Sequence, residues 1–394
     1  MAVPAVQAAR SKPFAVWTMA FRPFFLAASV WSAVALTGWI AMLLAGLRLP
    51  SRFDPLTWHI HEMLFGFVMA AIAGFMLTAI ANWTGRVPIS GWPLAALATL
   101  WLAGRLACLF SALIPFWLAA ATDLAFPFVL CAIVAREIIS SRNWRNLPMP
   151  VPIAVLGIAD LLMHLDVGGF AVPAGLGWRL GLAAIIVLIS VVAGRIIPAF
   201  TRNWLTKHGV ADLPAAHGMV DSVALGTLHA GMIGWVFFPT FQPVGGLLLL
   251  AAALNLWRLM RWRGCATSAE PLLSILHVGY FWVIVGAVLL GASMLTGRVP
   301  EAAAIHALTA GAIGTMVLGV MTRVSLGHSA RALTADRITG LIYLLVILAG
   351  AVRVLAAVSG SFLVLIQISA ALWIGSFVLF ALWYGRMLLM PPVP

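Results

Sequence analysis

Residues 57–81 of the chain are TWHIHEMLFGFVMAAIAGFMLTAIA, and a stretch of this kind decides the fold. After Glu62 it continues to residue 81 without a charged side chain. A helix needs about 20 apolar residues to cross the hydrocarbon core of a bilayer. We therefore expect residues 57–81 to form a transmembrane helix.

Eleven further stretches of similar length and apolarity surround this one. The predicted spans are 23–47, 57–81, 92–111, 113–136, 150–166, 175–198, 217–238, 243–260, 272–296, 302–323, 338–358 and 362–385. The sequence thus predicts an all-α integral membrane protein of about twelve transmembrane helices. We expect residues 1–394 to form a single transmembrane domain, with no cleaved signal peptide at the N-terminus.

The composition excludes a soluble protein. Hydrophobic residues make up 63% of the 394 positions, charged residues only 9%, and the mean hydropathy is +1.08. Soluble domains carry about 25% charged residues. In a membrane protein, an excess of Lys and Arg usually sets the orientation in the bilayer. The net charge of +12 is therefore not a sign of nucleic-acid binding. The three cysteines form no CxxC pair, so nothing supports a disulfide framework, a thiolate zinc site or a c-type haem.

The distribution of Lys and Arg predicts the orientation. If the N-terminus is cytoplasmic, 17 of the 23 basic residues lie on the inner side, 5 lie on the outer side and Arg105 lies within a span. The inner set includes Arg10 and Lys12. Cytoplasmic segments of membrane proteins are enriched in Lys and Arg, so both termini should be cytoplasmic.

Three predicted spans have similar residues at their cytoplasmic ends. The second, sixth and tenth spans each close on a cytoplasmic segment rich in Thr, Asn and Arg. Because these spans are four apart, the pattern is compatible with three repeats of four helices. It is equally compatible with independent capping of helix ends by the same residue types.

Histidines are the unusual polar residues of this chain, and five of the nine fall on the outer side in this topology. They are His59, His61, His164, His229 and His306. Ionisable groups within a membrane are costly and mark functional sites. Neutral imidazole is a ligand for haem iron and for copper.

We predict that His61 and His306, on the second and tenth spans at similar depth, are the two axial ligands of a haem. His59 points about 200° away from His61 on one helix, so a capping role for it is nearly as plausible as ligation. His229 is an additional candidate metal ligand, and His164 is expected to be an interfacial residue. Arg105 could hold a haem propionate, because guanidinium matches carboxylate.

Several motifs resemble those of the NnrS family, bacterial membrane proteins linked to nitric oxide stress. They run in order through most of the chain: FRPFF (21–25), WHIHEM (58–63), NWTGR (82–86), GR (104–105), RIIP (195–198), TRN (201–203), HALTAGAIGT (306–315), MTR (321–323) and LGH (326–328). The resemblance implies a twelve-helix protein of the bacterial inner membrane that contains haem and copper and supports tolerance of nitric oxide.

The architecture also resembles, more faintly, that of the haem–copper oxidases. Their core has twelve helices in three units of four, with haem-binding histidines on the second and tenth helices, where this chain has His61 and His306. It departs from them because its sixth span has no histidine and its seventh has a lone His229. The three-histidine copper site of those enzymes cannot be built here.

Two classes of function follow from the sequence. The leading hypothesis is a haem b protein, with or without copper, that binds or converts nitric oxide in the outer half of the bundle. The alternative is a transporter, or a factor that handles haem or metal for other proteins. No sequence signature indicates the electron donor.

Overall fold

The computed structural model describes residues 15–359 and 362–391. Arg10 and Lys12, counted above on the cytoplasmic side, lie outside the described residues. Within these residues the chain is helical and no strand forms, and twelve helices are long and apolar enough to cross a membrane. The prediction of an all-α membrane protein with twelve spans is confirmed.

Ten of the spans are single helices. They are α1 (Phe21–Ala45), α4 (Trp92–Leu109), α5 (Phe116–Ser140), α6 (Pro150–Val167), α7 (Leu176–Lys207), α8 (Met219–Phe237), α9 (Gln242–Met260), α10 (Pro271–Thr296), α13 (Arg337–Val358) and α14 (Phe362–Leu389). The other two are composite. Span 2 consists of α2 (Pro55–His61), η1 (Glu62–Val68) and α3 (Met69–Thr84); span 10 consists of α11 (Glu301–His306), η4 (Ala307–Ile313) and α12 (Gly314–Gly327).

Both composite spans contain a π-helical segment, and each segment begins directly after a histidine, His61 or His306. A π-helical turn shifts hydrogen bonding from i−4 to i−5 and occurs often at functional sites. In span 2 the carbonyl oxygen of Gly66 accepts a hydrogen bond of 3.0 Å from the Trp101 indole nitrogen of α4. The indole therefore ties α4 to the irregular part of span 2.

Span 2 begins at a well-defined cap. The Asp54 carboxylate accepts hydrogen bonds from the backbone nitrogens of Leu56 and Thr57, at 3.0 and 3.2 Å, and Pro55 is the first helical residue. Asp at the N-cap and Pro at N1 both favour helix initiation. Gly85 closes α3 at a φ of 67°, a left-handed conformation that suits glycine. These signals fix the depth of His61 in the bundle.

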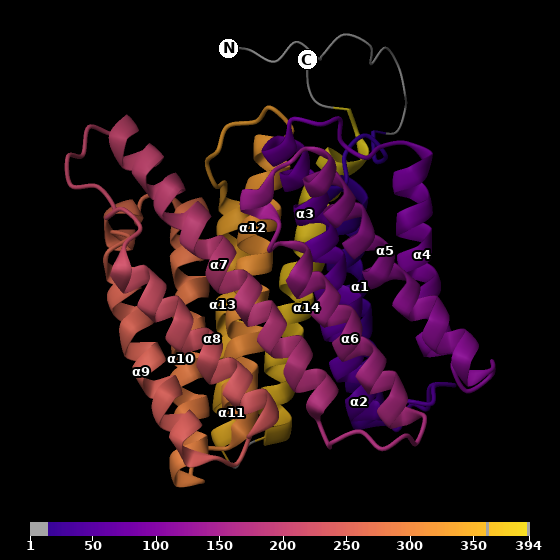
Figure 1. The fold of residues 1–394 in the computed structure, drawn as a ribbon. Helices are drawn as coiled ribbons and strands as arrows, with labels where there is room; N and C mark the ends of the chain where they lie inside the picture. Colours follow the sequence, from indigo (N-terminus) through magenta and orange to yellow (C-terminus); the bar gives the residue numbers. More distant parts are fainter. Residues whose placement is uncertain (1–14, 360–361, 392–394) are drawn as a thin grey trace.

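Consecutive spans pack side by side, and the bundle closes where α14 packs against α1 (Figure 1). The start of α1 and the end of α14 lie together. There the buried Arg22 guanidinium donates to the carbonyl oxygens of Met387, Leu388 and Met390, at 2.7 to 3.2 Å. Arginine at the end of a helix satisfies the last carbonyls and complements the helix dipole. The composite spans have α2 and α11 at the opposite end (Figure 1).

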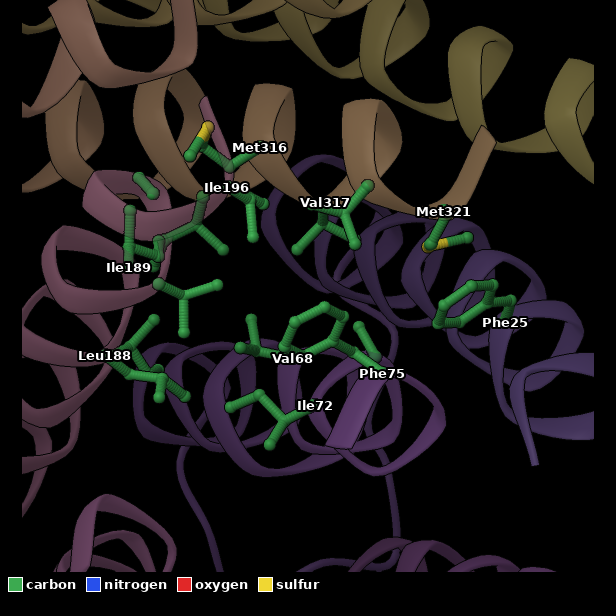
Figure 2. Close-up of a pocket in the computed structure, with 16 residues that line it drawn as sticks. Phe25, Val68, Ile72, Phe75, Leu188, Ile189, Ile196, Met316, Val317 and Met321 are labelled. Atoms are coloured by element: carbon green, nitrogen blue, oxygen red, sulfur yellow. The ribbon is translucent and has the colours of Figure 1, made fainter. Parts of the chain in front are cut away.

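Spans 2 and 10 are the most buried of the twelve, with 83% and 72% of their most apolar stretch inside the protein. Together with α7, the sixth span, they line an apolar cavity of about 80 Å³ (Figure 2). Residues that border it include Ile72 of α3, Leu188 of α7 and Val317 of α12. Three repeats of four helices would place the second, sixth and tenth spans together in this way.

Candidate metal centre

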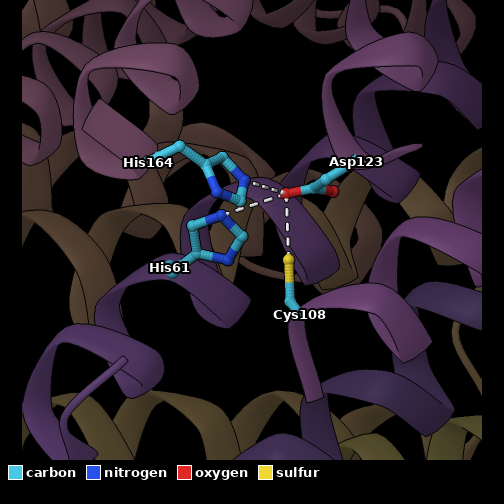
Figure 3. A group of neighbouring side chains, drawn as sticks. All are labelled: His61, Cys108, Asp123 and His164. Carbon is cyan, nitrogen blue, oxygen red and sulfur yellow. Dashed lines mark hydrogen bonds and ion pairs between the residues drawn. The ribbon is translucent and has the colours of Figure 1, made fainter. Parts of the chain in front are cut away.

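Four potential ligand side chains meet inside the first half of the bundle, on the side of α2. They are His61, Cys108, Asp123 and His164, all buried, with one ligand atom from each within 4.8 Å of the others (Figure 3). The residues come from span 2, α4, α5 and α6. Four successive spans therefore contribute one side chain each.

The Asp123 carboxylate is the centre of this cluster. Its Oδ2 atom lies 3.1 Å from His61 Nε2, 3.0 Å from His164 Nε2 and 3.1 Å from Cys108 Sγ, whose thiol donates to it (Figure 3). The two imidazole rings are 5.3 Å apart and nearly perpendicular. The Asp123 Oδ2 atom therefore contacts the other three potential ligand groups directly.

A second layer of charged groups surrounds the cluster. His61 Nε2 also lies 2.8 Å from Asp160, and His61 Nδ1 lies 3.1 Å from Glu62. The buried Arg105 guanidinium donates to the Glu62 carboxylate at 3.0 Å and also to Asp123. Each of these side chains is at most 2% exposed.

Two glycines make room for these carboxylates. A Cβ atom on Gly104 would lie 2.7 Å from Asp123 Oδ1. A Cβ atom on Gly66 would lie 2.8 Å from Glu62 Oε2 and 2.6 Å from the Trp31 indole nitrogen, which donates to Glu62 at 2.8 Å. Any larger residue at either position would displace the carboxylate, so the backbone is shaped around the charged groups.

The charges of this region do not balance. Three carboxylates, Glu62, Asp123 and Asp160, face one guanidinium, that of Arg105. With ionised carboxylates and neutral imidazoles, two negative charges remain in a buried part of a membrane-spanning bundle. Uncompensated charge is very costly there. A protonated carboxyl group, protonated histidines or a bound cation must supply the balance.

The donor set suits a transition metal. Two imidazoles and a thiolate are the ligands found in copper electron-transfer sites, and zinc accepts the same groups with a carboxylate as the fourth. The Glu62 carboxylate at His61 Nδ1 resembles the outer hydrogen bonds that orient metal-binding histidines. The residues present therefore fit a copper or zinc ion.

The structure pairs the predicted histidines differently from the sequence analysis. His61 meets His164 rather than His306. His59 contacts another helix, since its ring stacks on Trp39 of α1 with centroids 4.3 Å apart. His229 of α8 is bonded to the Ser190 hydroxyl at 2.8 Å.

One expectation from the sequence stays a prediction, and another needs correction. Both terminal nitrogens of Arg105 bind protein carboxylates in the structure, and its role at a haem propionate stays a prediction. His164 is not an interfacial residue but a buried member of the cluster.

Sequence reasoning missed Cys108 and the approach of both Asp123 and Asp160 to His61. A cysteine without a CxxC partner carries no signal of its own, and the carboxylates are on different helices. The signal that was available is that Arg105, Asp123 and Asp160 are charged residues in three consecutive spans. Such residues must pair with each other or with a ligand.

The fold and the cluster define a polytopic membrane protein with a buried group of metal-binding side chains. Its family is also clear from comparison: the chain belongs to the NnrS family, whose model, described as "NnrS protein", matches residues 15–391. The comparison with curated proteins gives no match. Membership suggests a role in the response to nitric oxide and the binding of a metal or haem.

Proposed function

We propose that this protein binds copper at His61, Cys108, Asp123 and His164, and that it binds or converts nitric oxide in the bacterial inner membrane. The observation that supports the metal is the convergence of four buried ligand atoms within 4.8 Å. Bound copper would supply one-electron redox chemistry. Nitric oxide is small and apolar, so it can reach such a site through lipid and apolar protein.

Within the proposal each protein group has a distinct task. Cys108, Asp123 and the two histidines would hold the ion, while Glu62, at His61 Nδ1, would orient the His61 ring. Arg105 neutralises one carboxylate, so a cation at the centre faces a net negative surrounding and is favoured electrostatically. Phe53, whose ring lies 4.7 Å from that of His61 and 5.4 Å from that of His164, shields the cluster from water.

Metal analysis of the purified full-length protein tests the copper site. We expect about one copper ion per chain and a visible absorption band from a copper–thiolate bond. Cys108→Ser should remove the band, and His164→Ala should remove most of the copper. The matched controls Cys265→Ser and His208→Ala alter exposed residues and should change neither quantity. Copper retained in full by both cluster variants would overturn the site.

Haem is the second cofactor in the proposal, and the structure offers a test of its ligands. Because His61 is a ligand of the proposed copper site, a haem would need other histidines, each with a ring nitrogen that no protein group uses. Both ring nitrogens of His61 face carboxylates. The only hydrogen bond of the His306 ring in the described chain joins Nδ1 to the Ala302 carbonyl at 2.7 Å. The Nδ1 atom of His59 is buried without a partner in the described chain. The residues fit a haem at His59 and His306 better than one at His61 and His306.

An optical spectrum distinguishes these haem ligands. With haem bound, His59→Ala and His306→Ala should each convert a low-spin spectrum to high-spin, because one imidazole is lost. His217→Ala, at an exposed site, is the control. Absence of a Soret band after growth with sufficient haem would contradict the haem proposal. An unchanged low-spin band in both folded variants would contradict this pair of ligands.

A role in nitrosative-stress tolerance is tested in cells. A strain that lacks the gene should grow more slowly under nitric oxide, and the native gene should restore growth while the Cys108→Ser variant should not. Equal growth of all three strains would contradict the role. The proposed location of both termini in the cytoplasm can be checked with reporter fusions at each end.

A further inference from the structure

Among the described residues, only apolar side chains border the cavity between span 2, α7 and span 10 (Figure 2). All 16 residues that line it are aliphatic, aromatic or methionine. Its volume of about 80 Å³ is several times the ~10–15 Å³ that one water-sized molecule needs. A water molecule inside would find none of the two to four polar partners that hold buried water. The cavity therefore suits an apolar guest.

Small side chains keep this space open. Ala71 of span 2 and Ala193 of α7 both border the cavity and are buried. A leucine at either position would extend three more carbon atoms into it. The size of the cavity is thus set by the residues at a few positions, and a single substitution can fill it.

An aromatic ring of span 2 lies between the cavity and the metal-binding cluster. Phe65 is 1% exposed, and the centre of its ring lies 5.4 Å from that of His61. The same ring packs on α7, where a Cβ atom on Gly181 would lie 3.0 Å from Phe65 Cζ. Three and four residues further along these two helices, Val68 and Ile185 border the cavity. The cavity therefore begins about one helical turn from a ring that packs beside a candidate metal ligand.

We propose that this cavity is a binding site for small apolar gas molecules, nitric oxide above all, and that Phe65 separates the bound gas from the metal centre. The choice of nitric oxide rests on the proposed function, whereas the affinity for an apolar guest rests on the lining alone. Nitric oxide is an uncharged diatomic molecule. It gains dispersion contacts with the cavity wall and gives up little hydrogen bonding when it leaves water. From there it reaches the metal through movement of the Phe65 ring.

Xenon is the probe for the binding site, because it enters dry apolar cavities and scatters X-rays strongly. Crystals of the native full-length protein pressurised with xenon should show a xenon atom among Ile72, Leu188 and Val317. Ala71→Leu should lose most of this occupancy, and Val317→Phe fills the same space from span 10 if the first variant does not fold. Ala230→Leu, the same substitution at an exposed position of α8, is the control and should keep native occupancy. Absence of xenon from the cavity in native crystals would overturn the site.

The link to the metal is tested with nitric oxide itself. In rapid mixing of the reduced, copper-loaded protein with nitric oxide, Ala71→Leu should slow association several-fold, while Ala230→Leu should keep the native rate. Phe65→Leu places a smaller side chain at the boundary and should speed association. An equal rate in the native, Ala71→Leu and Phe65→Leu proteins would overturn the role of the cavity in supplying the metal.

The two experiments also separate this inference from the proposed function. A protein that takes up xenon in the cavity but binds no copper contradicts the copper site and supports the gas site. A protein that binds copper but admits no xenon contradicts the gas site alone.

Discussion

Replacing Arg105 by Gln should reveal the electrostatic balance of the cluster. The Arg105 side chain is 2% exposed and binds the carboxylates of Glu62 and Asp123, which are fully buried. Gln is neutral and leaves these carboxylates without their cation. Removing one partner of a buried ion pair costs about 3–5 kcal/mol. We expect a loss of this size in the free energy of unfolding of the metal-free protein.

The measurement is reversible unfolding by SDS titration in detergent micelles. Arg136→Gln is the matched control, since Arg136 also binds a carboxylate, Glu137 at 2.7 Å, but is 67% exposed. Such a pair contributes at most about 1 kcal/mol. The double variant Arg105→Gln/Glu62→Gln should recover part of the loss, because it also removes a stranded negative charge.

Two results would refute this reasoning. If Arg105→Gln unfolds within about 0.5 kcal/mol of the native protein, the range of ordinary surface substitutions, the carboxylates do not depend on Arg105. If the double variant is no more stable than the single one, Glu62 and Arg105 are not coupled. Saturation with copper should reduce the loss caused by Arg105→Gln, because the added cation takes over part of the neutralisation.

Three further substitutions test the packing. Gly104→Ala should destabilise the protein by about 1–3 kcal/mol, because the new methyl group meets a buried carboxylate. In the same SDS titration Gly226→Ala, on a helix with open space around it, should be neutral or stabilising. Tyr280→Phe should cost about 1–3 kcal/mol, because the hydroxyl accepts a 2.7 Å bond from buried Arg258; a native stability would contradict that bond. Asp336→Ala should cost about 0.5–2 kcal/mol through loss of the α13 N-cap. Although partial burial raises the pKa of Asp336, its hydrogen bonds lower it below the usual value overall. The difference from native should therefore be present near neutral pH and vanish as the pH falls through that lowered pKa; a difference that persists in acid would contradict the assignment.

The twelve spans could be predicted from the sequence because hydrophobicity over about 20 residues is a local property. The expected boundaries near 57–81 and 302–323 fall within the observed composite spans. The π-helical segments after His61 and His306 were not foreseen. They depend on contacts such as that of Trp101 with the Gly66 carbonyl, which join different spans.

The sequence also predicts a depth for each histidine, since depth is set by position along a span. Depth is only one coordinate of a side chain. The direction in which it points, and the helix that it meets, depend on how twelve similar apolar helices pack. The sequence predicts a similar depth for His61 and His306, yet in the structure His61 meets His164 of α6, because helix packing decides which side chains face each other.

The sequence by itself determined that this protein spans the membrane twelve times, that it resembles the NnrS family, and which few polar residues must be paired. Only the tertiary structure decided the pairs: Asp123 with His61, His164 and Cys108, and Arg105 with Glu62. The physical reason is that membrane insertion depends on residues close in the sequence, whereas pairing of buried charges depends on residues far apart in the sequence. Insertion into a bilayer is decided segment by segment, whereas buried charges find partners on helices that only packing brings together.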